Sequence, residues 1–203
     1  MRRTLAVLGW LATAGCAWAQ IPILRVRVLD YARVPDTALR EFAAPASEIF
    51  RHSGIEAEWP ICRIQTRQGS CEPLADTEVF VKIVRLPATQ RRHGAAQFGT
   101  TVRQGARGLF SYVFWGRVEQ AARDHGIAPS LLLGHVIAHE AGHLLGLEHS
   151  AGGIMNEQLT APELLRAMQG NLHFTDEQGA ALRDVLAPRV EARDYRASSA
   201  ASR

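Results

Sequence analysis

Apolar residues mark four segments of the chain as strands. Ile23–Tyr31 alternates apolar with charged residues in its middle, which predicts a strand with one buried face. Ile55–Trp59 is a short second candidate, and Thr77–Leu86 is rich in β-branched residues, which favour strands. Leu109–Trp115 is more apolar and aromatic than the other three. These segments predict a sheet built from strands spread over the first part of the chain.

A helical pattern follows the first strand. It opens at Pro35 and Asp36, and Gly54 is placed to end it. Its apolar residues recur at intervals of three and four, as expected for a helix with one buried face: Leu39, Phe42, Ala43, Ala46, Ile49 and Phe50.

The second half of the chain is mainly helical in pattern. Short helices are predicted at Val118–Asp124 and Ala161–Met168, and a longer one runs from Pro129 or Ser130 to Leu147 at most. Thr175–Gln178 has the form of a capping box for a last helix that ends near Leu186. Two polar or glycine-containing segments are predicted as loops: Cys62–Cys71, and the stretch that holds Gly94, Gly99, Gly105 and Gly108.

The order of these elements predicts the fold class. Strand, helix, strand and strand in succession indicate an α+β fold, an α/β-type sandwich with a mixed sheet. The 203-residue length suits one domain, which we expect over residues 20–190. Residues 191–203 are rich in Ser and Ala at their end and are expected to be disordered. We expect a monomer.

The N-terminal residues 1–19 have the pattern of a secretory signal. Arg2 and Arg3 precede an apolar run, Leu5–Ala14, that is too short for a lasting membrane span. A small-x-small pattern then predicts cleavage near Ala19–Gln20, and a secreted or periplasmic protein. The alternative is a lipid anchor on Cys16, which ranks second because Thr13 stands where a larger aliphatic residue is usual. No other segment is long and apolar enough to cross a membrane.

Two cysteines remain after removal of that signal. An exported chain with Cys62 and Cys71 close in sequence predicts one disulfide between them, and two free buried thiols are the alternative. The net charge of +3 falls to +1 when Arg2 and Arg3 are removed, and no clustered basic face is evident. We therefore expect no nucleic-acid partner.

The segment HEAGHLLGLEH carries the candidate chemistry. On a helix, His139 and His143 lie on one face and can direct two imidazoles at a single metal ion. Glu140 is rotated about 100° from His139, so it flanks the ion and can take a proton from bound water. Gly146 can turn the chain out of the helix, which brings His149 within reach as a third ligand. Three protein ligands with one open position are typical of a catalytic zinc site.

One alternative pair exists on the same helix. His135 lies one turn before His139, but that pair would leave Glu140 on the wrong side and His149 too far away. We therefore interpret His135 as a core or rim histidine.

The pattern from His139 to His149 resembles the long zinc motif of the metzincin metallopeptidases, HExxHxxGxxH. The resemblance implies that Met155 is the Met-turn residue, an apolar floor below the zinc. Ser150 after the third histidine resembles the matrixin branch, and small secreted bacterial members are the nearest in type. The family fold implied is a mixed sheet with an antiparallel edge strand, an active-site helix, the Met-turn and a C-terminal helix. Glu157 stands where an additional tyrosine ligand occurs in some branches, which argues against such a ligand here.

The same resemblance implies how substrate binds. The strand before the zinc helix, about Leu109–Trp115, would act as an edge strand that pairs with an extended polypeptide. Asn156–Phe174 would line the pocket for the side chain after the cleaved bond.

Two functions are compatible with these residues. The first is a secreted zinc endopeptidase in which a metal-activated water attacks the peptide bond and Glu140 is the general base and acid. The second is a non-catalytic, zinc-stabilised binding module with a degenerate protease fold. Glu140 favours the enzyme, because a degenerate site has little reason to keep it.

Overall fold

The computed structural model describes residues 21–63, 78–85, 97–105 and 107–187. The predicted signal, the Cys16 anchor and the C-terminal tail lie outside these residues. So does Cys71, while Cys62 is buried in the third strand, so the disulfide stays a prediction. Within the described residues, no helix has the length and hydropathy needed to cross a membrane.

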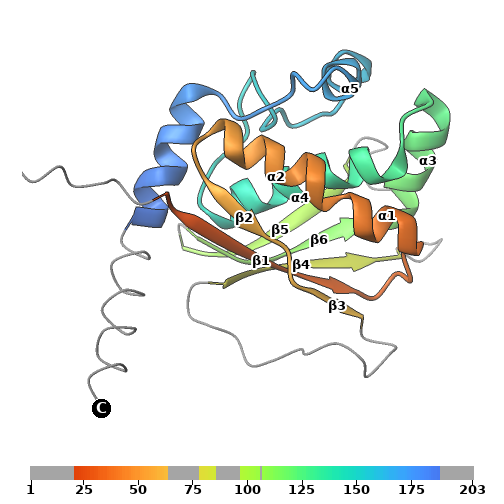
Figure 1. The fold of residues 1–203 in the computed structure, drawn as a ribbon, viewed down its shortest axis with the longest axis horizontal. Helices are drawn as coiled ribbons and strands as arrows, with labels where there is room; N and C mark the ends of the chain where they lie inside the picture. Colours follow the sequence, from red (N-terminus) through yellow and green to blue (C-terminus); the bar gives the residue numbers. More distant parts are fainter. Residues whose placement is uncertain (1–20, 64–77, 86–96, 106, 188–203) are drawn as a thin grey trace, which may run out of the picture.

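Six strands among the described residues form one mixed sheet (Figure 1). They are β1 (Ile23–Asp30), β2 (Glu56–Glu58), β3 (Ile61–Arg63), β4 (Glu78–Val84), β5 (Gly99–Gln104) and β6 (Arg107–Phe114). The order is β2-β1-β4-β6-β5, and β3 also pairs with β1. All pairs are parallel except β5 with β6, which is antiparallel. The predicted mixed sheet is thereby confirmed.

The edge strand differs from the sequence-based expectation. Leu109–Trp115 was predicted to be the edge, but β6 lies inside the sheet, between β4 and β5. The antiparallel edge is β5, a segment that the sequence predicted as a glycine-containing loop. β6 is hydrogen-bonded to β4 on one side and to β5 on the other. Strands inside a sheet are usually more apolar than edge strands, which agrees with the apolar sequence of this segment.

The helices begin and end close to where their patterns predict. They are α1 (Asp36–Glu41), α2 (Ala43–His52), α3 (Trp115–His125), α4 (Pro129–Leu144), α5 (Ala161–Met168) and a C-terminal helix at residues 176–187. The helix predicted after Pro35 is divided at Phe42 into α1 and α2. Pro45 has no N–H to donate to the carbonyl of Glu41, which accounts for the break.

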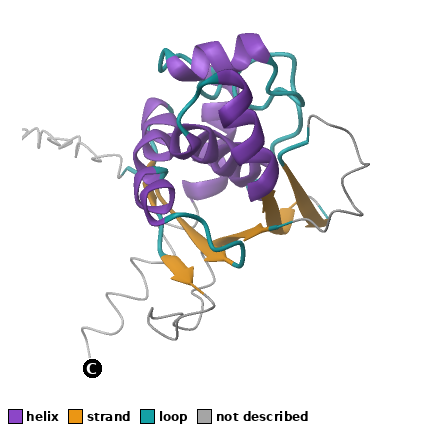
Figure 2. Ribbon diagram, turned by 90° about the vertical axis from the view of Figure 1, so that its right-hand side faces the viewer, coloured by secondary structure: helices purple, strands orange, loops and turns teal. Residues whose placement is uncertain are grey.

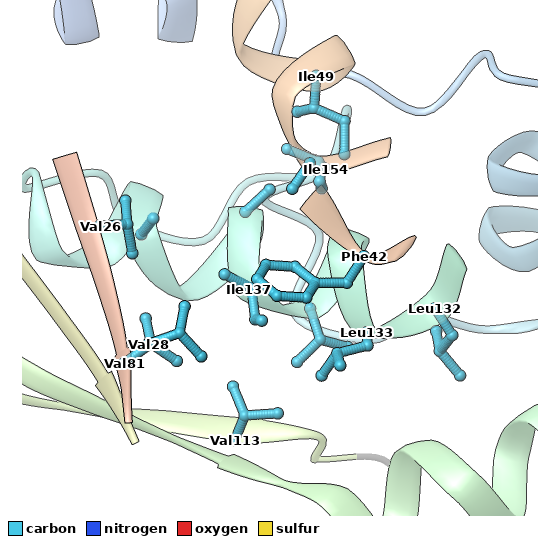
Figure 3. Packing of buried hydrophobic residues seen from close by; sticks show 14 of the residues in the cluster. Val26, Val28, Phe42, Ile49, Val81, Val113, Leu132, Leu133, Ile137 and Ile154 are labelled. Carbon is cyan, nitrogen blue, oxygen red and sulfur yellow. The ribbon is translucent and has the colours of Figure 1, made fainter. Parts of the chain in front are cut away.

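The core lies between the sheet and the helices (Figures 2 and 3). Val26, Val28, Val81 and Val113 project from the sheet toward α4 and the α1–α2 segment. Opposite them, and fully or almost fully buried, are Phe42, Ile49, Leu132, Leu133, Ile137 and Ile154. α4 is thus the central helix, buried along nearly its whole length.

Close packing of α4 depends on a glycine. A Cβ at Gly134 would lie 2.7 Å from the carbonyl oxygen of Phe42 and 2.8 Å from the Pro45 ring. The absence of a side chain therefore lets α1 and α2 approach α4 at backbone distance. This contact helps to fix the helix that carries the candidate ligands.

Candidate metal centre and active site

Three histidines from the end of α4 and the following loop converge on one point. The Nε2 atom of His143 lies 3.1 Å from Nε2 of His139 and 3.0 Å from Nε2 of His149. The ligand atoms of all three lie within 4.8 Å of one another. His139 and His143 are buried on α4, whereas His149 is exposed at the cleft.

The turn that returns His149 to α4 begins at Gly146. Its φ of +102° lies in the region that favours glycine. The Gly146 N–H donates to the His143 carbonyl and the Leu147 N–H donates to the Gly142 carbonyl. This pair of bonds is a Schellman motif, which caps the helix and reverses the chain.

Two backbone carbonyls orient the buried histidines. Nδ1 of His139 lies 2.8 Å from the Ile154 carbonyl oxygen, and Nδ1 of His143 lies 2.8 Å from that of Leu147. A carbonyl can only accept, so each Nδ1 carries the proton and each Nε2 presents a lone pair. Burial also lowers the pKa of His139 to about 4, despite the opposing Ile154 hydrogen bond, and burial lowers that of His143 as well. Both rings are therefore neutral near pH 7.

These donors fit a zinc ion. Nitrogens bound at about 2.0–2.1 Å on a tetrahedral zinc lie roughly 3.3 Å from one another. The two measured Nε2 separations, 3.1 and 3.0 Å, are close to that value. Two lone pairs at 3.1 Å cannot hydrogen-bond to each other, whereas a cation between them would satisfy both.

Glu140 lies beside the histidines and faces the sheet. Its carboxylate accepts a 2.7 Å hydrogen bond from the Thr101 hydroxyl at Oε2, and only 3% of the residue is exposed. Burial raises its pKa to about 7, and hydrogen bonds from Thr101 and Ser111 act in the opposite direction. A group with this pKa can both accept and donate a proton near neutral pH.

The site opens into a cleft of about 620 Å³. The three histidines and Glu140 form part of its floor. β5 lines one side with Gly99, Thr100, Thr101 and Arg103, and residues 156–159 line another. The residues expected to shape a substrate pocket, Asn156 onwards, thus begin at the cleft.

Met155 is fully buried against α4. A Cβ at Gly142 would lie 2.6 Å from the Met155 sulfur, so the sulfur occupies the space beside that glycine. The Ser150 N–H donates to the Met155 carbonyl, and the Ile154 N–H donates to that of His173. The loop therefore folds into a tight turn beneath the end of the helix.

Three site residues were not identified from the sequence: Gly99, Thr101 and Ser111. They lie on β5 and β6, far from the motif along the chain, and no local spacing links them to Glu140. His135, the alternative ligand, instead places Nδ1 2.9 Å from the carbonyl of Leu131 on its own helix. Among the described residues, the ligand cluster contains the other three histidines only.

Comparisons with solved structures support the fold. Archaemetzincin from Methanopyrus kandleri superimposes with a TM-score of 0.51 at 15% identity, over 81% of this chain and 96% of that one. Metalloproteinase-II from Bacteroides fragilis gives a TM-score of 0.42 at 13% identity, over 74% and 53%. The sequence matches no protein-family model, and no curated protein is significantly similar to it. The superposition on archaemetzincin shows that the chain has an archaemetzincin-like metallopeptidase fold.

Proposed function

We propose that the chain is a zinc-dependent endopeptidase of the metzincin type. The observation that carries the proposal is the pair of unprotonated Nε2 atoms, on His139 and His143, that face each other at 3.1 Å. Two neutral imidazoles held in this way by backbone acceptors form a prepared cation site. The third histidine and the adjacent Glu140 match what a catalytic, rather than a structural, site requires.

His139, His143 and His149 would hold the zinc. When bound, zinc polarises the scissile carbonyl and lowers the pKa of water, which supplies the nucleophile. Glu140 is the general base of the reaction and then the acid that protonates the leaving amine. Its buried position and its pKa of about 7 suit both proton transfers.

The substrate class we propose is polypeptide bound in an extended conformation. β5 ends the sheet within the described residues, so its outer backbone groups are available to a further strand. The same strand lines the cleft beside Glu140. A peptide added along β5 would therefore lie in the cleft that the histidines also line.

We also propose export, on the sequence pattern of residues 1–19, with a secreted, matrixin-like bacterial protease as the type. The disulfide between Cys62 and Cys71 belongs to this proposal, because disulfides persist in oxidising compartments. Mass spectrometry of the mature protein tests both points: an N-terminus at Gln20 and one intramolecular disulfide are expected. Lipid on Cys16 would instead support the anchored alternative.

The test of the enzyme is a Glu140→Ala variant, measured for zinc content and for cleavage of a denatured protein. We expect full zinc loading and a loss of at least about 100-fold in rate, since general acid–base groups contribute 10²–10⁴-fold. Chelation should inactivate the wild type, and zinc should restore it. Persistent cleavage by zinc-loaded Glu140→Ala would refute the role of Glu140. A wild type that binds zinc but cleaves nothing would favour the non-catalytic binding module.

A further inference from the structure

The Glu140 carboxylate is held by side chains of the sheet as well as by its own helix. The Thr101 hydroxyl on β5 lies 2.7 Å from Oε2, and the Ser111 hydroxyl on β6 lies 2.6 Å from that of Thr101. Thr101 and Ser111 are directly opposite each other in the antiparallel register. Ser111 of β6, Thr101 of β5 and Glu140 of α4 therefore form one chain of hydrogen-bonded hydroxyl and carboxylate groups.

The hydrogen bonds among these three residues have one consistent direction. An ionised Glu140, which a general base requires, only accepts, so Thr101 must donate its single hydroxyl proton to Oε2. The Thr101 oxygen, 2.6 Å away, can then accept from Ser111, which is fully buried. The Glu140 main-chain carbonyl oxygen is a second, more distant acceptor for the Ser111 hydroxyl, at 3.4 Å. Ser111 thus fixes the rotation of the Thr101 hydroxyl, and Thr101 fixes the carboxylate.

Gly99 closes the other side of the carboxylate. A Cβ at this position would lie 2.7 Å from Cδ of Glu140 and 2.7 Å from the Tyr112 carbonyl oxygen. The carboxyl group therefore rests in the space that a side chain on β5 would fill. The terminal torsion of a glutamate is otherwise broad, so these contacts define where the proton acceptor stands.

We propose that Thr101 is a positioning residue for Glu140 and that Ser111 acts through Thr101. This inference rests on the proposed function, in which Glu140 moves the proton. Because β5 also lines the cleft, one strand sets both the base and the place where an extended substrate lies. Alignment of base and substrate is thereby built into a single element.

The first experiment measures kinetics of Thr101→Val, which keeps the shape and removes the hydroxyl. We expect kcat to fall about 10–100-fold with KM and zinc content unchanged, as for other groups that orient a catalytic residue. Thr101→Ser should restore most of kcat, and Ser111→Ala should give a smaller loss than Thr101→Val. Ser47→Ala is the control, since it removes a hydroxyl that accepts from the Trp59 indole and neither residue lines the cleft. Wild-type kcat in Thr101→Val, or a Thr101→Ser variant as slow as Thr101→Val, would overturn the proposal.

The second experiment does not require activity. Urea unfolding of wild type, Thr101→Val, Glu140→Ala and the double variant forms a thermodynamic cycle. We expect Thr101→Val to destabilise the protein more when Glu140 is present than when it is absent. Additive effects would refute the contact between them, even if the wild type proved to have no peptidase activity. Coupling without any hydrolysis would instead leave the positioning intact and refute the proposed function alone.

Discussion

Glu140→Gln should stabilise the metal-free protein at high pH. Burial raises the pKa of Glu140 from 4.5 to about 7, so the folded state disfavours its charged form. A pKa raised on folding adds stability that is fully present below pH 4.5 and is lost as the pH rises through 7. At pH 9, this rise of the Glu140 pKa from 4.5 to about 7 means that the ionised carboxylate lowers the free energy of unfolding by about 3 kcal/mol, which Glu140→Gln should recover. At pH 5 the same relation predicts that the carboxylate lowers the free energy of unfolding by less than about 1 kcal/mol. Glutamine keeps an oxygen that accepts from Thr101 but carries no charge.

The assay is urea unfolding of chelator-treated wild type and Glu140→Gln at pH 5 and pH 9. All other titratable groups are common to the two proteins, so the comparison of the two at each pH cancels their contribution to first order. Glu56→Gln, at an exposed position on β2, controls for the change in net charge. Equal stability differences at both pH values, or a Glu140→Gln protein less stable than wild type at pH 9, would refute the reasoning.

Two glycines give further predictions, with Gly116→Ala as the common control because a Cβ there meets nothing within 4 Å. Gly99→Ala would press a methyl group against the Glu140 carboxyl and the Tyr112 carbonyl, so we expect at least about a tenfold loss of kcat. Its zinc content, measured by atomic emission, should stay unchanged; loss of zinc instead would contradict the steric explanation. Gly146→Ala forces a side chain to φ +102°, which costs about 1–2 kcal/mol and should lower Tm by roughly 2–8 °C. An unchanged Tm in a calorimetric scan would show that the turn relaxes at no cost.

The elements that sequence predicted well are those set by local spacing. Two histidines four residues apart share a helix face whatever surrounds them, and α5 has the bounds that its pattern predicted. Gly146 belongs to the same class, because a Schellman turn is decided within six residues. The convergence of three Nε2 atoms follows from these local rules once the helix is formed.

β5 could not be predicted in the same way. Its sequence, Gly99–Gln104, has one strongly apolar residue, Val102, which points outward and is 37% exposed. An edge strand beside a cleft needs little apolar surface, so it lacks the alternation that marks β1 and β4. The family resemblance placed the edge strand at Leu109–Trp115 instead, a segment whose apolar character agrees with a strand that has a neighbouring strand on each side.

The histidines and Glu140 are held in place by different kinds of group. This difference determines which parts of the site can be predicted from a sequence motif. The candidate zinc ligands His139 and His143 are oriented by main-chain carbonyls, which any residue type could supply. The proposed base, Glu140, is held by the hydroxyl of Thr101, which few residue types can replace. The ligand support is therefore encoded by loop geometry, through Gly146 and the turn at Met155, and tolerates side-chain changes. The support of Glu140 depends on the identity of Thr101, 39 positions earlier in the sequence, and no motif of fixed spacing includes that position. Loss of the Thr101 hydroxyl should consequently affect proton transfer, whereas metal retention should depend on changes to the loop backbone, such as substitution of Gly146.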